Sequence, residues 1–223
     1  TPALFEDRGW TVTPSVSAAF EEIASKGSTT FLCGWGGAAT GAVGVSDTVR
    51  ATSRAAIDQL HADGLSTAML TGDSSFVAES IAREIGLDTV IAEVLPADKA
   101  AAIAAMQADG AHVAFVGDGI NDAPALTVAD VGMAVGSGTE VAIEAGDIVL
   151  MSGDPTASVT AIRLARRTFA TIRQNLFWAF VYNTAAIPLA CLGFLNPMIA
   201  AGAMALSSVS VVANSLRLRR FEP

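Results

Sequence analysis

The feature that most constrains this chain is a run of 43 residues, 174–216, that contains no Asp, Glu, Lys or Arg. Such a run is long enough for two membrane spans of roughly 20 residues each. Gly193-Phe-Leu-Asn-Pro197 offers the break between them, because Asn-Pro favours a turn. We therefore expect a two-helix transmembrane hairpin over 174–216. A buried helical hairpin in a soluble protein is the less favoured alternative, since uncharged runs this long are rare in such cores.

Basic residues flank both outer ends of this run, and the predicted connecting turn has none. By the positive-inside rule, both ends and the domain before them are expected in the cytoplasm, as part of a multi-pass protein of the cell membrane. In this prediction residues 156–173 form a basic amphipathic linker helix and 217–223 form a cytoplasmic tail. The basic residues are Arg163, Arg166, Arg167, Arg173, Arg217, Arg219 and Arg220.

The composition favours a protein that is partly membrane-embedded and partly globular. Of the 223 residues, 52% are hydrophobic and 16% are charged, and the mean hydropathy of +0.49 is too high for an ordinary soluble domain. The net charge of −9 argues against a nucleic-acid partner. Cys33 and Cys191 lie far apart, so the sequence offers neither a disulfide framework nor a Cys-x-x-Cys metal site.

Residues 46–155 alternate short apolar runs with helical patterns, which predicts an α/β domain with a parallel sheet covered on both faces. A smaller strand, helix, strand, strand piece is predicted over 1–45, with a hairpin turn at Gly34, Gly36 and Gly37. Strands are expected at 10–12, 29–33, 42–45, 65–70, 89–92, 113–116, 131–135 and 148–150, and helices at 18–24, 57–60, 77–85, 96–106 and 140–145.

The best-defined candidate site follows the predicted strand 113–116. The run Val116-Gly-Asp-Gly-Ile-Asn-Asp122 brings Asp118, Asn121 and Asp122 close to the strand end. Ligands of open α/β sheets gather at the carboxyl ends of strands, and carboxylate and amide oxygens suit Mg²⁺. Taken alone, the run fits an ordinary solvated turn equally well, because Gly, Asn and Asp are common turn residues.

Two further groups are predicted at the same sheet edge, namely Thr71 with Asp73 after strand 65–70, and Lys99 at a helix start. A hydroxyl, an ammonium and several carboxylates suit phosphoryl transfer, which depends on holding charged oxygens and a metal ion in place. Alone, Thr71 and Asp73 fit a turn or cap, and Lys99 fits a solvated helix charge. The combination at strand ends favours chemistry over these ordinary roles.

Three motifs together resemble those of a known family: Thr71-Gly-Asp73, Pro96-Ala-Asp-Lys99 and 116–126 resemble the hinge and phosphorylation-domain motifs of P-type ATPases. The resemblance covers almost the whole chain. It implies a haloacid-dehalogenase-like α/β domain followed by the two-helix transmembrane hairpin. In these terms 1–45 is the C-terminal part of a nucleotide-binding domain, and 46–155 is a phosphorylation domain lacking its first strand.

The hairpin resembles the last two membrane helices of the heavy-metal group of these pumps, and of the copper(I) exporters in particular. The matching stretches are 175–188 with Tyr182-Asn183, and 204–208 with Asn214. The chemistry of the side chains supports copper(I) as the ion in part, because the soft thioether of Met204 suits Cu(I). A span free of carboxylate and lysine argues against harder ions such as Zn²⁺.

The resemblance also implies cofactors, partners and residue roles. ATP and Mg²⁺ are expected as cofactors of the parent protein, Cu(I) as the transported ion, and the lipid bilayer and the upstream part of the same pump as partners. The implied catalytic residues are Thr71, Gly72, Asp73, Lys99 and Asn121, the implied Mg²⁺ ligands are Asp118 and Asp122, and the implied ion path comprises Tyr182, Asn183, Met204 and Ser208.

Three hallmarks of the family are missing from the chain: the phosphorylated aspartate of an Asp-Lys-Thr-Gly-Thr motif, a Cys-Pro-Cys and a His-Pro. All are expected before Thr1. The favoured hypothesis is thus the C-terminal portion of an ATP-driven heavy-metal export pump, inactive by itself. The alternative is a non-catalytic, membrane-anchored fragment that binds Mg²⁺ or a complementary chain. A membrane-tethered phosphatase needs the same missing aspartate.

Overall fold

The computed structural model describes residues 2–25, 28–45, 48–193 and 196–221. The chain divides into two compact units, Thr1–Thr156 and Ala157–Pro223. Each unit is described separately below.

The first unit opens with a small piece in which helix α2 lies against a β-hairpin. Gly36 and Gly37 have positive φ angles, so the predicted turn between the two antiparallel strands is confirmed. The strand predicted at 10–12 is reduced to a single bridge between Thr11 and Ala38. The elements are α1 (Pro2–Asp7), α2 (Pro14–Ser25), β1 (Thr29–Trp35) and β2 (Ala38–Val45).

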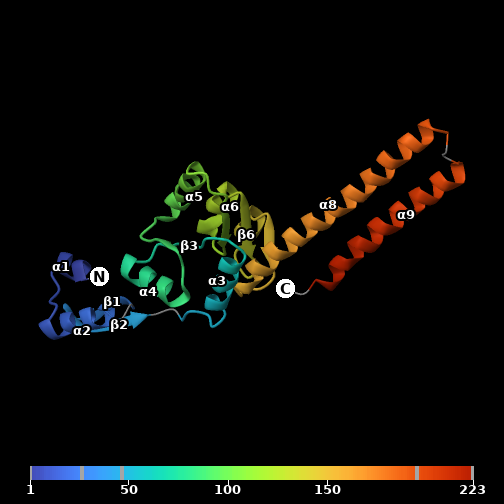
Figure 1. The fold of residues 1–223 in the computed structure, drawn as a ribbon. Helices are drawn as coiled ribbons and strands as arrows, with labels where there is room; N and C mark the ends of the chain where they lie inside the picture. The colour runs from blue at the N-terminus through green and yellow to red at the C-terminus, as the bar shows by residue number, and fades with distance from the viewer. Residues whose placement is uncertain (1, 26–27, 46–47, 194–195, 222–223) are drawn as a thin grey trace. The chain divides into compact units, whose positions relative to one another are not determined.

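The rest of the first unit alternates helices with parallel strands, as predicted, but the strands form two sheets and not one. One sheet pairs β3 with β4, and the other has the order β5-β6-β7. Among the described residues, β3 and β5 thus each keep one edge without a strand partner. Figure 1 shows these elements in colours that run from cyan through green to yellow. They are α3 (Ser53–Ala62), β3 (Ala68–Leu70), α4 (Ser75–Ile85), β4 (Thr89–Ile91), η1 (Pro96–Asp98), α5 (Lys99–Ala108), β5 (Ala114–Gly117), η2 (Ile120–Asp122), α6 (Ala123–Val128), β6 (Val131–Val135), α7 (Glu140–Ala145) and β7 (Ile148–Leu150).

The core of this α/β region is built around the short helix α6, which the sequence pattern did not predict. Ala125 is fully buried and packs with Ile103 of α5, and Leu70 of β3 and Phe115 of β5 lie against this cluster. On its other side, Leu126 packs with residues of β6 and α7, again next to Phe115. Hydrophobic packing therefore connects β3 and β5 although no strand pairing does.

An aspartate directly before a strand anchors the neighbouring strand at three places. Each carboxylate accepts a hydrogen bond from a backbone N–H within one residue of the start of the adjacent strand. Charge-assisted bonds of this kind are stronger than neutral ones. The amino ends of the parallel strands are thereby fixed. The pairs are Asp88 with Thr67 (2.7 Å), Asp130 with Val113 (2.8 Å) and Asp147 with Gly132 (2.8 Å).

Two of these carboxylates have lowered pKa values. The backbone N–H of Thr67 is the main cause for the pKa of Asp88, with help from the Thr67 hydroxyl and from His61, whose Nε2 lies 3.0 Å away. For Asp130 the main cause of the lowered pKa is the side-chain amide of Gln107, followed by the backbone N–H of Val113. In both cases hydrogen bonding stabilises the charged form more than desolvation opposes it.

The second unit is a helical hairpin whose two helices run antiparallel (Figure 1). The predicted linker helix 156–173 is not separate, because one helix, α8 (Thr156–Cys191), continues through it. The carboxylate of Asp154 accepts the N–H and the hydroxyl of Thr156 at 2.9 and 2.7 Å, which sets where α8 begins. The hairpin is completed by α9 (Pro197–Leu216) and η3 (Arg217–Arg220).

The predicted break between the two helices is confirmed, because α8 ends at Cys191 and the Asn-Pro pair starts α9. Asn196 is the N-cap, and its side-chain oxygen accepts the N–H of Met198 at 2.9 Å. Pro197 is the first helical residue, where its missing N–H costs nothing. Of the predicted break, residues 194–195 lie outside the described residues.

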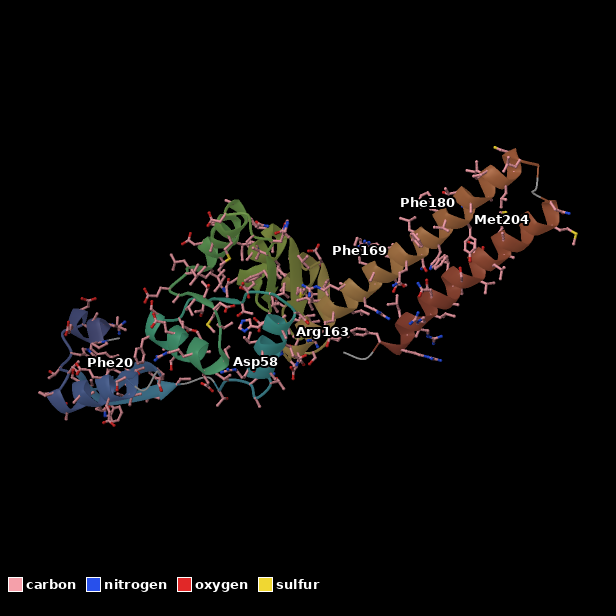
Figure 2. The ribbon with its side chains drawn as sticks, in the orientation of Figure 1. Phe20, Asp58, Arg163, Phe169, Phe180 and Met204 are labelled. Atoms are coloured by element: carbon pink, nitrogen blue, oxygen red, sulfur yellow. The ribbon has the colours of Figure 1, made fainter. Side chains whose placement is uncertain are left out.

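Polar side chains join the two helices near the open end of the hairpin. Asn214 donates to the side-chain oxygen of Asn175 at 2.9 Å, and Asn175 donates to Ser215 at 3.0 Å. Large apolar side chains face outward elsewhere, including Phe169 and Phe180 of α8 (Figure 2). Over the parts of the chain that the structure describes, no helix combines the length and the apolarity that crossing a membrane requires. The hairpin is therefore present, while its insertion into a bilayer stays a prediction.

The lowered pKa values of Asp88 and Asp130 predict acid sensitivity. Because the folded pKa lies below the unfolded value of about 3.9, these carboxylates contribute their full stabilisation above about pH 4 and lose it as the pH falls through the folded pKa. The urea midpoint of Asp130→Asn should thus be lower than that of the wild type at pH 7, and the difference should shrink below pH 4. Asp109→Asn, at an exposed position, is the control. A wild-type midpoint that does not fall between pH 5 and pH 3 contradicts the prediction.

Candidate functional site

The loop after β5 depends on the lack of a side chain at Gly117. A Cβ at this position would lie 2.7 Å from the Cβ of Asp122, closer than real Cβ contacts occur. The loop turns through η2, and Oδ2 of Asp122 accepts the N–H of Gly119 at 3.2 Å. Asp122 is only 8% exposed, so its carboxylate is held inside the turn.

Lys99 and Asp122 form a close ion pair. The Lys99 Nζ lies 2.7 Å from Oδ1 of Asp122, and the two side chains are only 18% and 11% exposed. Lys99 is the first residue of α5, directly after η1, which begins at Pro96. Both oxygens of Asp122 are therefore engaged within the protein, one by Lys99 and the other by Gly119.

Asp118 has different surroundings from Asp122. Its side chain is exposed, and among the described residues it has no hydrogen-bonding partner. Its backbone is fixed, because its carbonyl accepts the N–H of Thr139 at 3.0 Å and a side chain at Gly138 would collide with that carbonyl. The result is an open carboxylate on a well-defined backbone. Asn121, in the same loop, is exposed as well.

The loop after β3 is closed on itself. The hydroxyl of Thr71 donates to Oδ2 of Asp73 at 2.9 Å, and the N–H of Asp73 donates back to the Thr71 oxygen at 3.1 Å. Gly72 lies between them, and a Cβ there would come within 3.4 Å of the Val94 carbonyl. Thr71 and Asp73 thus form a compact turn, which is the structural role expected of these residues without any chemistry. The Thr71 hydroxyl still lies at the carboxyl end of β3.

Glu93 stabilises this loop, a role that the sequence pattern did not predict. Its φ of 58° is the positive value that a residue other than glycine rarely adopts. Its N–H donates to the Asp73 carbonyl at 2.9 Å, and its carboxylate accepts the N–H and the hydroxyl of Ser75 at 3.3 Å. Glu93 therefore caps α4, whereas the N-cap residue Ser74 makes no side-chain bond to the helix. Nothing in the sequence marks a glutamate for this conformation.

The predicted site residues form two groups at strand ends. Lys99, Asp122 and Asp118 meet around the loop after β5, and Thr71 with Asp73 follows β3. In the described part of the chain, no hydrogen bond or ion pair joins the two groups. They belong to different sheets, whose strands share the core cluster around α5 and α6.

The loop after β5 suits Mg²⁺ at one carboxylate. Asp118 is open to solvent, whereas the oxygens of Asp122 are taken by Lys99 and Gly119. No group of three or more His, Cys, Asp or Glu side chains in the described ranges is arranged to hold a metal. Mg²⁺ does not need such a group, because it keeps several waters and binds through one or two carboxylates. The donor set therefore fits this ion.

The hairpin does not by itself bring together the four residues of the predicted ion path. Met204 is 70% exposed (Figure 2), and Asn183 and Ser208 are exposed and bond to carbonyls of their own helices. Tyr182 alone lies on a less exposed stripe. The stripe on α8 comprises Thr171, Asn175, Ala179, Tyr182 and Ala186, and the one on α9 comprises Ala203, Ser207, Ser210, Val211 and Asn214.

Comparison with known proteins gives consistent similarities. Residues 4–130 match the haloacid dehalogenase-like hydrolase family. The probable copper-exporting P-type ATPase V of Mycobacterium tuberculosis is 52% identical over 218 residues, which cover 98% of this chain and 28% of that protein. The copper-exporting P-type ATPase of Bacillus subtilis is 53% identical over 203 residues, which cover 91% of this chain and 25% of that protein. The chain therefore spans about a quarter of the length of these relatives.

A solved structure is similar over both units. The crystal structure of a zinc-transporting PIB-type ATPase in its E2.Pi state has a TM-score of 0.80 and 38% sequence identity. The match covers 92% of this chain and 34% of that chain.

The Lys99–Asp122 pair should contribute strongly to stability. Asp122→Asn leaves the ammonium of Lys99 with little exposure and no carboxylate, so we expect a loss of about 2–3 kcal/mol in the free energy of unfolding. Asp98→Asn, at an exposed neighbouring position, should change it by less than about 0.5 kcal/mol. Lys99→Met combined with Asp122→Asn should cost less than the sum of the single changes, measured by urea unfolding. Strict additivity contradicts a direct interaction.

Proposed function

Because the chain belongs to the haloacid dehalogenase-like hydrolase family, we propose that it is the C-terminal portion of an ATP-driven copper(I) export pump. One structural observation carries the proposal. The loop after the parallel strand β5 contains both Asp122, in its largely buried ion pair with Lys99, and the exposed carboxylate of Asp118. The similarity to copper-exporting P-type ATPases over 98% of the chain supports the choice of ion.

In this proposal the pump works through an aspartyl-phosphate whose aspartate lies upstream of this chain. Lys99 offsets the charge of the phosphoryl group, and Asn121 helps to position it. Gly72, which has no side chain, lets the phosphoryl oxygens approach the loop. Thr71 has one hydroxyl proton, so donating it to a phosphoryl oxygen requires giving up its bond to Asp73. The carbonyl contacts of Asp73 and Thr71 with the 93–94 backbone then keep the loop in position.

Asp118 is the proposed main ligand of Mg²⁺, with Asp122 next to it. When bound, Mg²⁺ neutralises charge on the phosphoryl oxygens. The protein itself holds the Asp118 backbone through Thr139 and holds Lys99 through Asp122. Preorganised charges of this kind contribute more to phosphoryl transfer than covalent chemistry by the protein.

A strand from the upstream part of the pump is proposed to lie between β3 and β5. Support comes from their unpaired edges, from the core that Leu70 and Phe115 share, and from Val116 of β5, which is 45% exposed. Residues 46–155 are then a phosphorylation domain completed by that strand, and 1–45 is the end of the nucleotide-binding domain. The strand also supplies the missing nucleophile.

The hairpin 174–216 is proposed to span the cell membrane, with 156–173 as its cytoplasmic entry and 217–223 as its cytoplasmic tail. The uncharged run and the many exposed apolar side chains support this. Small residues on the less exposed stripes, such as Ala179, Ala203 and Ser207, are typical of membrane helices that approach closely. Tyr182, Asn183, Met204 and Ser208 form the ion path together with other helices of the pump.

The complete pump, expressed from the reading frame that contains this chain, tests the proposal. Membranes that carry it should hydrolyse ATP faster with Cu(I) or Ag(I) than with Zn²⁺ or Co²⁺. Asp118→Asn should lower this activity at least about 100-fold, because it removes the open carboxylate. Asp109→Asn should leave it unchanged. A frame without an upstream Asp-Lys-Thr-Gly-Thr, or phosphorylation of the 223-residue chain alone by ATP, is incompatible with the proposal.

The ion path has a separate test in the same membranes. Tyr182→Phe and Met204→Ala should each weaken activation by Cu(I), because they remove a phenol and a soft thioether. Met198→Ala, which removes another exposed thioether that lies outside the path, is the matched control. Unchanged activation in both path variants removes these residues from the path.

A further inference from the structure

A pocket at the open end of the hairpin is lined mainly by arginines. Its volume is about 370 Å³, and its walls are Arg167 of α8, Arg217, Leu218 and Arg220 of η3, and Phe221. None of these residues belongs to the site described above. The pocket lies within the second unit, so its geometry depends only on the hairpin.

The hairpin register explains why these arginines meet. Asn175 pairs with Asn214 and Ser215, which fixes the two helices against each other. Arg167 lies eight residues before Asn175, or about 12 Å along α8 at 1.5 Å per residue. Arg220 lies six residues beyond Asn214, or roughly 9–12 Å in the same direction through the end of α9 and η3. The guanidinium groups therefore come to the same level.

The positive charge of the pocket is not balanced by a visible partner. Within the described ranges, no Asp or Glu lies within ion-pair distance of Arg167, Arg217 or Arg220. Three like charges around one pocket repel each other, so an anion bound there is stabilising. The planar guanidinium fork fits phosphate oxygens in a bidentate manner, which favours a phosphate group over a halide.

The surroundings indicate the source of the phosphate. Arg217 directly follows an uncharged run whose apolar side chains are exposed, and Arg167 lies seven residues before that run. Leu218 and Phe221 add apolar surface to the pocket wall. We propose that this pocket binds the phosphate diester of an anionic lipid headgroup. Basic pockets between membrane helices on the cytoplasmic side suit such headgroups. The proposal rests on the membrane-spanning hairpin of the proposed function.

Soluble short-chain lipids test the pocket on the full 223-residue chain in a neutral detergent. Native mass spectrometry should detect binding of dioctanoyl phosphatidylglycerol in preference to dioctanoyl phosphatidylcholine. Arg217→Gln combined with Arg220→Gln should weaken this binding at least about tenfold, because two charged hydrogen-bonding partners are lost. Arg219→Gln removes an equal charge from the same segment but not from the pocket wall, and it should retain binding.

Three results overturn the proposal. Equal binding of the two lipids removes the preference for an anionic headgroup. If Arg219→Gln weakens phosphatidylglycerol binding as much as the pocket variant does, binding depends on the general surface charge and not on the pocket. Inorganic phosphate that binds as tightly as phosphatidylglycerol and displaces it identifies a free-phosphate site.

A second measurement separates this proposal from the proposed function. Flotation with vesicles of pure phosphatidylcholine reports insertion of the hairpin without any anionic lipid. A chain that does not insert contradicts the membrane-spanning hairpin itself. A chain that inserts but shows no preference for phosphatidylglycerol contradicts the lipid site alone.

Discussion

The ion pair between Lys99 and Asp122 is the interaction on which the candidate site depends. It joins the start of α5 to the loop after β5 with little solvent to weaken it. Because Asp122 also accepts the Gly119 N–H, the same carboxylate fixes the loop that presents Asp118. The two carboxylates therefore have different tasks: Asp122 organises the loop, and Asp118 stays open. A shift in the position of α5 would therefore displace Asp122 and the loop that carries Asp118.

The sequence predicted most of this site because its chemistry is local. Strand ends and glycines could be identified at Asp118, Asp122 and Thr71, and Lys99 was expected at a helix start. The partner of Lys99 was not predictable, since 23 residues separate it from Asp122 and only the fold brings them together. The roles of Glu93 and Gly138 were not predictable for the same reason. Their roles depend on backbone conformation and on close approach of a distant carbonyl.

The fold was predicted correctly in its alternation and strand direction but not in its pairing. Periodicity shows which residues form strands, but it does not show whether two strands are neighbours. The strands β3 and β5 share a core through Leu70 and Phe115 without a hydrogen bond between them. The anchoring role of the aspartates before β4, β6 and β7 was not predictable either, because polar residues commonly precede strands. Their function becomes clear only when the neighbouring strand is in place.

The continuity of α8 has a mechanical consequence. Its 36 residues correspond to a rod of about 54 Å, with Asp154 holding its first turn and Pro188 close to its far end. A loop between 173 and 174 would be a flexible joint, at which the two parts could rotate independently. Between its first turn and Tyr182 the helix has no such flexible joint, because no proline interrupts the backbone hydrogen bonds before Pro188. A small rotation of its first turn is therefore delivered as a rotation of Tyr182 and its neighbours, about 40 Å away.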